Sequence, residues 1–528
     1  MFNHDGLTQD GIAEAFIEFA KKEKLSFFKL SPSMKPFDAV RYERLMDGLE
    51  AVELTWQRVL RDNLSIRIDG EYFKKKYLVE EGLIEKYDPF QLGEVSFITD
   101  GQHGYHEVDD ESPISHITAR NLRNWFADNI GSDKLAQWVD DKNQRSSLKE
   151  GDVLLSTRGT VGYCAIVKSD ILPANIDQDL ARISINSDSN LIPEYLATYL
   201  NSRIGNDWVV RNASGMVQQG LPIKRVNHIP VPDLSSFFQI DIKQIIDTSW
   251  FLNTSSKKDY QEAEDLLLLE LGLNDWQPIE ETAAVKSFSE SFLSSGRLDS
   301  EYYQPKYDEL YKLLEASCLK KEWDLKMLNS LSSLFKYGSS EPFEYLDEGV
   351  PFLRIADLQK YRFNEKNLKF ISQEAAKHQQ ATVRTGDVLI SRSGTLGLAI
   401  TTPHYLNNAV YGSYFILTRP RQEIILPTYL ALYLNSLVGK LQTEQANTGG
   451  IQTNLTIPVL ESLLIACPPL NIQQKLADKV NKSYDAEDKS KQLLEIAKTG
   501  VERAIETDEA TATTWMNQQL KALGVDLP

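Results

Sequence analysis

The sequence predicts an α+β protein in which two related domains are joined by two long helices. Residues 151–167, GDVLLSTRGTVGYCAIV, and residues 386–402, GDVLISRSGTLGLAITT, are near-copies of a strand, a small polar loop and a second strand. Copies this far apart indicate duplicated domains rather than a stack of short repeats. Each half then ends in a stretch where apolar and small residues recur every three or four positions, which predicts helices that pair as a coiled coil. We expect an approximate two-fold between the domains and antiparallel long helices.

The composition is that of a globular protein. The chain has 528 residues, of which 42% are hydrophobic and 10% aromatic, enough for sizeable cores. Its three cysteines, Cys164, Cys318 and Cys467, lie far apart, so we expect neither a disulfide framework nor a cysteine zinc site. The sequence has no signal-peptide pattern at its start and no apolar run long enough to span a bilayer. We therefore expect a cytoplasmic protein without membrane association.

The charge distribution limits the functions that the chain can have. A net charge of −18 argues against a strongly basic nucleic-acid-binding protein. Acidic residues are concentrated in residues 237–320, however, and the rest of the chain is closer to neutral. Nucleic-acid binding by the two domains therefore stays compatible with the composition.

Each half opens with the same block. Residues 53–77 (ELTWQRVLRDNLSIRIDGEYFKKKY) align with residues 285–307 (VKSFSESFLSSGRLDSEYYQPKY). The aligned side chains are Arg67, Asp69, Glu71 and Tyr72 in the first half and Arg297, Asp299, Glu301 and Tyr302 in the second. Ahead of the first block, Ile12, Phe16 and Phe19 fall on one face of a helix, which predicts a helical extension that docks on the body or caps it.

A histidine-containing segment follows in the first half. Residues 96–122 match residues 333–358, with Pro113 and Ile117 aligned to Pro351 and Ile355. The first copy contains His103, His106 and His116 together with Asp109, Asp110 and Glu111. The second copy has none of these histidines, and their local spacing fits no helical ligand pair, so we interpret the segment as a solvated turn and expect no metal site.

Each signature stretch is followed by a helix that begins at a proline, Pro193 or Pro427. Tyrosines one helical turn apart in these helices are interpreted as core residues, namely Tyr195, Tyr199, Tyr429 and Tyr433. A loop rich in glycine and amide side chains comes next, at residues 212–226 and 446–460. An exposed loop between two structured elements is a common place for recognition.

These features predict seven segments. They are an N-terminal helical extension (1–52), a first domain (53–236), a first long helix (237–276), a linker (277–295), a second domain (296–469), a second long helix (470–510) and a C-terminal tail (511–528).

Motifs for common catalytic chemistry are absent from the sequence. There is no P-loop, no G-x-G-x-x-G fingerprint, no G-x-S-x-G elbow, no H-E-x-x-H and no cysteine–histidine constellation. The one Pro-Pro pair precedes Leu470, so it does not form the Asn/Asp-Pro-Pro-aromatic motif by which adenine methylases resemble one another. We therefore expect a protein that is not an enzyme and has no cofactor of its own.

Taken together, these motifs resemble the specificity subunit of type I restriction-modification systems. The resemblance covers nearly everything after residue 52 and rests on RIDGEYF, RLDSEYY, EYLDEGVPFLRIADL, the two GDVL stretches and PPLNIQQKLADKV. The first half departs from the last of these motifs at IPVPDLSSFFQIDI, which leaves the start of its long helix open. Residues 1–30 also resemble the C-terminal tail of type I adenine methyltransferase subunits.

The resemblance implies two target-recognition domains, each reading one part of a bipartite double-stranded DNA site. It implies that the long helices hold these readers apart and bind methyltransferase subunits, which supply S-adenosylmethionine and catalysis. It allows a restriction subunit as a further partner, and a role in DNA methylation and host defence.

Two loops in each half carry the side chains that we expect to contact DNA. Arginine and amide side chains read base edges, and hydroxyl groups contact phosphates. The expected DNA-binding residues are Ser156, Thr157, Arg158, Thr160, Gln218, Gln219, Lys224 and Arg225 in the first half, and Ser391, Arg392, Ser393, Thr395, Asn447, Gln452 and Asn454 in the second. Two other functions stay open: an acidic protein-interaction scaffold that does not read DNA, and an S-adenosylmethionine-dependent enzyme with an unrecognised site.

Overall fold

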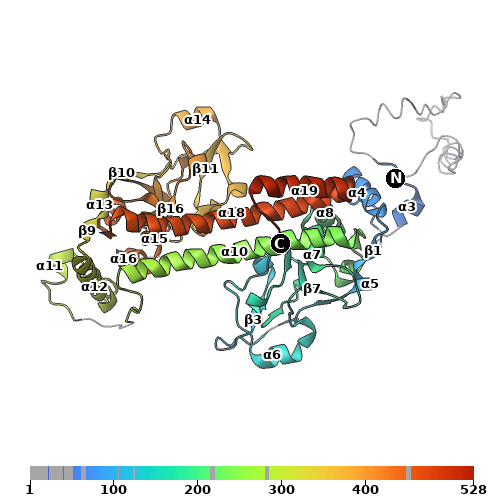
Figure 1. Cartoon of the computed structure of the whole chain (residues 1–528), viewed down its shortest axis with the longest axis horizontal. Helices are drawn as coiled ribbons and strands as arrows, with labels where there is room; N and C mark the ends of the chain where they lie inside the picture. Colours follow the sequence, from blue (N-terminus) through green and yellow to red (C-terminus); the bar gives the residue numbers. More distant parts are fainter. Residues whose placement is uncertain are drawn as a thin grey trace. The chain divides into compact units, whose positions relative to one another are not determined.

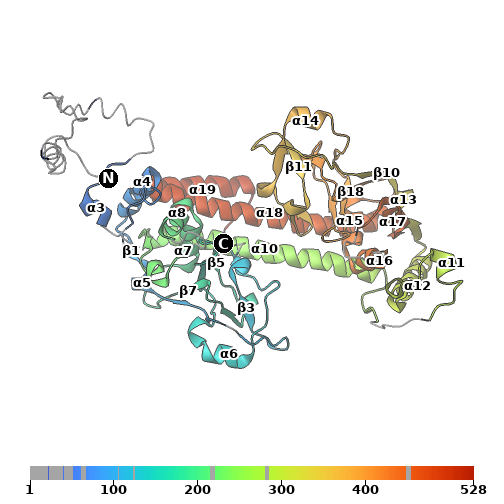
Figure 2. The same ribbon diagram turned by 180° about the vertical axis from the view of Figure 1, so that it is seen from behind.

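The computed structural model describes residues 52–527 with seven short gaps, together with Lys22 and Val40 (Figures 1 and 2). The gaps are residues 61–62, 64–66, 105, 123–124, 214–219, 280–284 and 447–453. The predicted helical extension at residues 1–52 therefore lies almost wholly outside the described residues. The chain divides into two compact units, Met1–Trp250 with Ser490–Pro528, and Phe251–Lys489.

The first unit is built on a four-stranded antiparallel sheet. Its strand order is β2 (Ser96–Asp100), β7 (Leu180–Ile185), β4 (Val153–Ser156) and β5 (Cys164–Ile166). Two short pairs complete it, the antiparallel β1 (Phe90–Gln91) and β8 (Pro230–Val231), and the parallel β3 (Ser115–Ile117) and β6 (Ala174–Ile176). Its short helices are α3 (Trp56–Leu60), α4 (Lys75–Glu85), α5 (Leu92–Val95), α6 (Gln137–Lys142), α7 (Pro193–Asn201), α8 (Arg203–Asn212), α9 (Ile223–Val226) and α19 (Glu509–Leu523). Helix α7 packs against β4 and β5, and Figure 1 shows β3 and β7 between α7 and α6.

The second unit repeats this plan. Its four-stranded antiparallel sheet has the order β10 (Ser332–Tyr337), β18 (Phe415–Pro420), β15 (Val388–Ser391) and β16 (Ala399–Thr401). The other strands are β14 (Lys369–Ile371), β11 (Val350–Leu353) and β17 (Val410–Tyr411) in one sheet, the hairpin β12 (Leu358–Gln359) and β13 (Arg362–Phe363), and the pair β9 (Asp324–Met327) and β19 (Leu464–Cys467). The helices are α11 (Phe292–Ser295), α12 (Pro305–Lys321), α13 (Leu328–Leu331), α14 (Gln373–Lys377), α15 (Pro427–Asn435), α16 (Leu437–Ala446) and α17 (Ile457–Ser462).

The signature strands form the centre of both sheets because both of their faces are covered. All four residues of β4 and all four of β15 are buried. In the second unit, Val388 and Ile390 belong to the hydrophobic cluster that contains α15, whereas Leu389 belongs to a separate cluster on the other face. A continuous apolar run is the expected sequence for a strand buried on two sides.

The strand pairing corrects one part of the sequence alignment. Ile117 of β3 lies opposite Ile176, and Leu353 of β11 lies opposite Tyr411. Ile176 and Tyr411 end the strands that directly precede β7 and β18, so they are equivalent positions. Ile117 therefore corresponds to Leu353 and not to Ile355. The aligned prolines were misleading because the loop before the strand differs in length between the two copies.

The paired tyrosines are core residues, as the sequence predicted. Tyr195 and Tyr199 in α7 have no exposed surface, and neither have Tyr429 and Tyr433 in α15. Each hydroxyl donates a hydrogen bond to a backbone carbonyl, for example Tyr195 to Pro232 at 2.8 Å. A buried phenol requires such a partner, and here the partner ties the helix to the segment that leads into the long helix.

The two long helices are α10 (Ser236–Glu270) and α18 (Leu470–Glu506), and each contributes to both units. In the first unit, Ser249 Oγ donates to the Ser490 carbonyl at 3.0 Å and Ser490 Oγ returns a bond to the Ser249 carbonyl at 2.8 Å. In the second unit, the bonded pairs are Ser256–Ser483, Asp259–Lys482 and Glu262–Lys479. Residue numbers rise along α10 while they fall along α18, so the helices are antiparallel. The predicted α+β class with two sheet-containing domains and packed long helices is confirmed.

The start of the first long helix was left open by the sequence. In the structure, the side chain of Gln239 ties this end of α10 to the segment before α7. Gln239 Oε1 accepts a hydrogen bond from the Ile192 backbone N–H at 3.0 Å, and Gln473 Oε1 accepts one from the Leu426 backbone N–H at 2.8 Å. Both side chains are nearly fully buried. Gln239 is therefore the equivalent of the glutamine in the PPLNIQQ motif, although the residues before it differ.

The C-terminal segment is helical where the sequence analysis expected only a tail. Helix α19 begins after Asp508, whose side chain accepts a hydrogen bond from the Thr511 backbone N–H at 2.8 Å. It packs closely on α18, because a Cβ at Gly500 would lie 2.2 Å from the sulfur of Met516. Of the helices in the described part of the chain, none is long and apolar enough to cross a membrane.

Candidate nucleic-acid interface

The two predicted contact loops meet in each half of the chain. The Thr157 carbonyl accepts a hydrogen bond from the Leu221 backbone N–H at 2.7 Å. The Arg392 carbonyl accepts the equivalent bond from the Leu455 backbone N–H at 2.9 Å. Leu221 and Leu455 lie within the glycine- and amide-rich loops, so each of these loops is attached to the loop after the signature strand. In the first unit, Arg158 and Gly220 also form a bridge.

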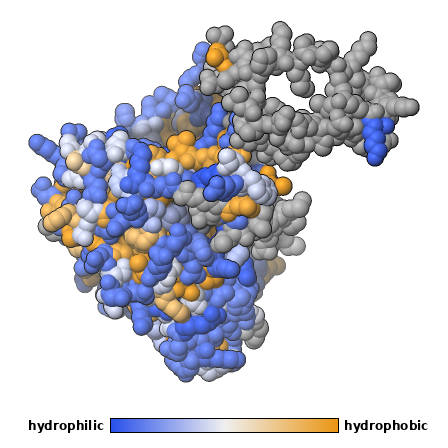
Figure 3. Space-filling model, turned by 90° about the vertical axis from the view of Figure 1, so that its right-hand side faces the viewer, coloured by the Kyte–Doolittle hydropathy of each residue, from blue (hydrophilic) through white to orange (hydrophobic). Residues whose placement is uncertain are grey.

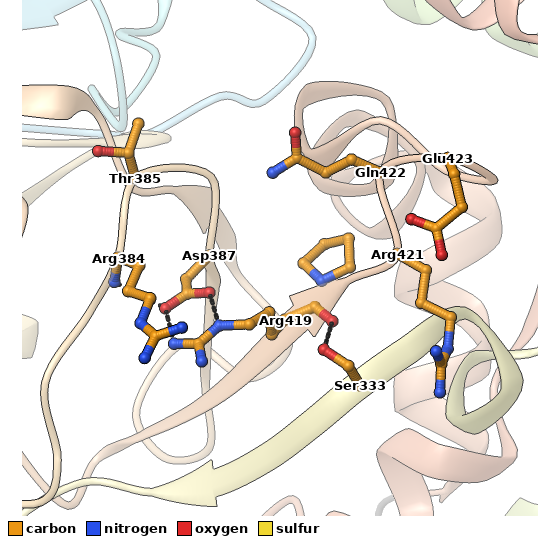
Figure 4. Close-up of a pocket in the computed structure, with 9 residues that line it drawn as sticks. Ser333, Arg384, Thr385, Asp387, Arg419, Arg421, Gln422 and Glu423 are labelled. Carbon is orange, nitrogen blue, oxygen red and sulfur yellow. Dashed lines mark hydrogen bonds and ion pairs between the residues drawn. The ribbon is translucent and has the colours of Figure 1, made fainter.

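The aspartate of each GDVL stretch has a structural role. Arg182 Nε donates to Asp152 at 2.6 Å, and Arg419 Nε donates to Asp387 at 2.7 Å. Each carboxylate also accepts a backbone N–H from the residue three positions earlier, at 2.8 and 2.7 Å. Figure 4 shows the Asp387–Arg419 pair at the edge of a pocket of about 400 Å³, which Arg384, Arg421 and Glu423 also line. This aspartate therefore fixes the start of the strand, away from the loop at its other end.

The serine of each signature loop closes the loop from inside. Ser156 Oγ donates to the Thr160 carbonyl at 2.7 Å and accepts from the Tyr163 backbone N–H at 2.8 Å. Ser391 makes the same two contacts, with the Thr395 carbonyl and with Leu398 N–H at 2.9 Å. Neither serine has exposed surface. Their hydroxyls are used inside the loop, so Ser156 and Ser391 act as scaffold residues.

The next position differs between the halves. Thr157 is buried, and its hydroxyl donates to the Asp179 carbonyl at 3.0 Å. Arg392 is half-buried, and its guanidinium carbon lies 4.9 Å from the centre of the Tyr337 ring. The buried Arg392 Nε has no hydrogen-bond partner among the described residues. Thr157 is therefore a scaffold residue, whereas Arg392 presents a cation that its own loop does not neutralise.

The other predicted contact residues divide by exposure. Arg158, Thr160, Lys224, Thr395 and Asn454 are exposed. Ser393 is half-buried and Arg225 is buried. The remaining four, Gln218, Gln219, Asn447 and Gln452, lie outside the described residues.

Carboxylates accompany Arg158 in the first unit. Its Nη1 lies 3.8 Å from Asp179 Oδ1, and both side chains are partly exposed. Burial raises the pKa of the nearby Asp177 to about 6, and the hydrogen bond that Asp177 accepts from the Asp179 backbone N–H at 2.9 Å opposes this rise. The single long contact to Asp179 leaves donors of Arg158 available to a ligand.

The repeated opening block anchors the start of each amide-rich loop, a role that the sequence analysis did not assign. Arg67 pairs with Asp69, and its guanidinium carbon lies 5.0 Å from the Tyr72 ring centre. The Tyr72 carbonyl accepts a hydrogen bond from Arg211 Nε at 2.6 Å, one residue before α8 ends. Burial lowers the pKa of Arg225, which lies close to this tyrosine and to Arg67.

The second half repeats this anchor with one substitution. Arg297 pairs with Asp299 and stacks over Tyr302 at 4.4 Å. The Tyr302 carbonyl accepts from Gln445 Nε2 at 3.1 Å, one residue before α16 ends. Gln445 thus replaces Arg211. The signal in the sequence was the repeated Arg-x-Asp-x-x-Tyr spacing, which places an ion pair beside an aromatic ring.

One group of side chains in the first unit has the composition of a metal site. His106, His116 and Asp133 each offer a ligand atom, and these atoms all lie within 4.8 Å of one another. Burial, and next the neighbouring His106 ring, lower the pKa of His116 to about 4, so its imidazole is neutral at pH 7. Asp133 lies outside the segment that contains the histidines, so local spacing gave no sign that it lies beside them.

The exposed surface is mixed in character. On the face in Figure 3, hydrophilic residues predominate and hydrophobic residues are interspersed among them. Exposed large hydrophobic residues in the first unit include Trp56, Val79 and Val210.

Comparison with known proteins gives a family match and weaker relatives. Residues 320–497 match the family model described as the type I restriction modification DNA specificity domain. The specificity subunit of the type I restriction enzyme EcoBI of Escherichia coli is 21% identical over 330 residues, which are 59% of this chain and 63% of that protein. The chain thus spans less than two thirds of the length of this relative.

Two solved structures are also similar to the chain. The S subunit of a type-I restriction-modification system from M. genitalium is 14% identical, with 83% of this chain and 96% of that chain covered and a TM-score of 0.36. The HsdS subunit from Thermoanaerobacter tengcongensis is 17% identical, with 80% and 96% covered and a TM-score of 0.25.

Proposed function

We propose that this chain is a specificity subunit of a type I restriction-modification system and selects the DNA sequence on which its partner subunits act. The chain itself is non-catalytic in this proposal, and each half reads one part of a split double-stranded site. The partners are methyltransferase subunits, which dock on the long helices, and a restriction subunit that joins them. We place the complex in the cytoplasm, together with the DNA.

The observation that carries the proposal is the contrast between scaffold and loop side chains in the two halves. The buried ion pairs, the loop-closing serines and the joined loops are the same in both. The side chains that the loops present differ: Arg158 stands where the second half has Ser393, and Arg392 stands where the first half has Thr157. One scaffold with two sets of presented groups is the arrangement expected of two readers of different sequences.

The chemistry of the presented groups suits base recognition. An arginine binds the O6 and N7 atoms of guanine with two parallel hydrogen bonds in the major groove. Arg158 is exposed, and Arg392 keeps an unpaired buried Nε among the described residues. Thr160 and Thr395 are exposed hydroxyls beside them, and Lys224 is an exposed cation on α9, which suits phosphate contact. We propose recognition domains at residues 53–236 and 296–469, with spacer helices within 237–276 and 470–510.

Methylation mapping tests this proposal. The chain is co-expressed with the methyltransferase subunit encoded beside it, and methylated adenines are sequenced in cells with and without the gene. We expect a bipartite motif that disappears without the gene. Arg158→Ala should relax the preference in one half-site only, and Arg392→Ala in the other. A split motif that both variants leave unchanged would assign base reading to other residues, and methylation that is independent of the gene would overturn the proposal.

An acidic interaction scaffold is the second candidate, because the net charge of −18 opposes DNA binding. The two candidates differ in their response to salt. For a DNA reader assembled with its methyltransferase, the logarithm of the affinity for DNA falls linearly with the logarithm of the salt concentration. If the chain is only a scaffold, it contributes nothing to the slope of log affinity against log salt concentration. Replacing Lys224 by alanine should then leave this slope unchanged, whereas it should make the slope shallower for a DNA reader.

A further inference from the structure

Three neighbouring backbone segments of the first unit converge at one place. His106 lies in the loop after β2, His116 is the central residue of β3, and Asp133 lies in the loop before α6. His116 N–H donates to the Asp133 carbonyl at 2.9 Å. The adjoining segments are held in the same way, by Ala136 N–H to the Glu107 carbonyl at 3.1 Å. Backbone hydrogen bonds therefore fix the positions of all three residues before any ligand binds.

The potential ligand atoms of these three residues lie close together. The two imidazole rings lie 4.1 Å apart between centroids, with 60° between their planes. One ligand atom from each histidine and one from the Asp133 carboxylate all lie within 4.8 Å of one another. Ligands that bind one ion at about 2 Å must lie within about 4 Å of each other, so small side-chain rotations complete the geometry.

The second unit shows what the same position looks like without such ligands. With the corrected alignment, His116 corresponds to Phe352, the residue before Leu353 in β11. Phe352 packs edge-on against Phe343, with ring centroids 5.0 Å apart and 67° between the planes. An apolar aromatic pair is therefore sufficient for packing at this place. The first unit replaces it with two nitrogen ligands and adds a carboxylate beside them.

We propose that His106, His116 and Asp133 bind one transition-metal ion of the Zn²⁺ class. Two imidazoles and one carboxylate are the ligand set that such ions prefer, whereas Mg²⁺ and Ca²⁺ prefer oxygen ligands alone. His116 is 95% buried, so water competes little for its ring nitrogen. Three protein ligands leave one tetrahedral position for water or for an oxygen atom of a ligand.

The bound ion would stabilise the first recognition unit. It links three segments that surround β3, and it would act in the first unit alone, because the equivalent aromatic pair of the second unit has no ligand atoms. Stabilisation follows from binding to the folded state, and it grows with the logarithm of the metal concentration above the dissociation constant.

Metal titration of the full chain without a histidine tag tests the site. Co²⁺ serves as the spectroscopic probe for Zn²⁺, and calorimetry with Zn²⁺ gives the stoichiometry. We expect one equivalent of ion with visible Co²⁺ absorption bands and a higher unfolding temperature with Zn²⁺ than with a chelator. His106→Phe, which keeps an aromatic ring but removes the ligand nitrogen, and Asp133→Asn should each weaken binding at least tenfold.

The controls separate this site from other histidines and from unfolding. His103→Gln changes an exposed histidine that pairs with Asp100 at 2.7 Å, and it should leave binding unchanged. Circular dichroism verifies that each variant is folded. The proposal is overturned if the wild-type chain binds no Co²⁺ or Zn²⁺, or if the double variant His106→Phe/Asp133→Asn binds with wild-type affinity. Neither readout depends on DNA recognition.

Discussion

Replacing Asp152 by alanine removes the carboxylate that neutralises Arg182 inside the first unit. The Asp152 carboxylate accepts hydrogen bonds from Arg182 Nε at 2.6 Å, from Ser184 Oγ at 2.6 Å and from the Lys149 backbone N–H at 2.8 Å. The side chains of Asp152 and Arg182 are only 3% and 6% exposed. The substitution therefore leaves a guanidinium buried without an opposite charge, and it leaves other donors unpaired.

The duplication supplies a matched control for this substitution. Removing one partner of a buried ion pair lowers the free energy of unfolding by about 3–5 kcal/mol. Asp387 is equally buried, but its partner Arg419 is 25% exposed. Water can solvate that guanidinium after the substitution, so Asp387→Ala should cost about 1–3 kcal/mol, the range for donors left unpaired. The difference between the two variants measures the effect of arginine burial.

Hydrogen–deuterium exchange with peptide resolution reports on each sheet separately, so the chain need not unfold in one step. Each 1.4 kcal/mol changes an opening equilibrium tenfold, so Asp152→Ala should accelerate exchange in β4 and β7 on the order of 100-fold or more. Exchange in β15 and β18 should stay at the wild-type rate. Asp387→Ala should show the reverse pattern with a smaller factor. Equal factors in the two variants would refute the argument from arginine exposure.

Three further predictions concern pH, the long helices and the C-terminal helix. Because the pKa of Asp177 is raised to about 6, wild-type stability relative to Asp177→Asn should be greatest below pH 4 and should fall as the pH rises through 6; a constant difference in thermal unfolding across this range contradicts this. Ser249→Ala and Ser490→Ala should each cost about 1 kcal/mol and should not add in a double-mutant cycle, since their hydroxyls share contacts; additive losses would contradict this. Asp508→Ala should cost α19 about 1 kcal/mol through loss of its cap to Thr511, seen as faster amide exchange in α19 alone.

The sequence predicted those features that repeat within it. The α+β class, the two sheet-containing domains and the long helices followed from the paired GDVL stretches and from helical spacing. The tyrosines of α7 and α15 were assigned to the core because they lie one turn apart on a helix opened by proline. Duplication made these inferences strong, because each half served as an aligned copy of the other.

The candidate site was predicted only in outline, for a physical reason. The repeat located the loops, but side-chain direction within a tight loop depends on hydrogen bonds that no spacing rule encodes. Ser156 turns inward because the loop needs an acceptor for Tyr163 N–H. Thr157 follows it inward, whereas the larger Arg392 at the same position stacks on Tyr337. The anchoring role of Arg67 and Tyr72 was missed because Arg211, which also contacts Tyr72, is far from both of them in the sequence.

The way in which each loop is held explains how the side chains that it presents can vary without damage to the sheet. The bonds that close and join the loops come from backbone groups and from a buried serine, and the bonds that start the amide-rich loops end on the carbonyls of Tyr72 and Tyr302. Backbone acceptors are independent of side-chain identity, so Arg158 can be exchanged for the equivalent of Ser393 without loss of a scaffold contact. The GDVL repeat thus separates the contacts that hold each loop from the side chains that the loop presents, and under the proposed function this separation would let one type of domain serve two different targets.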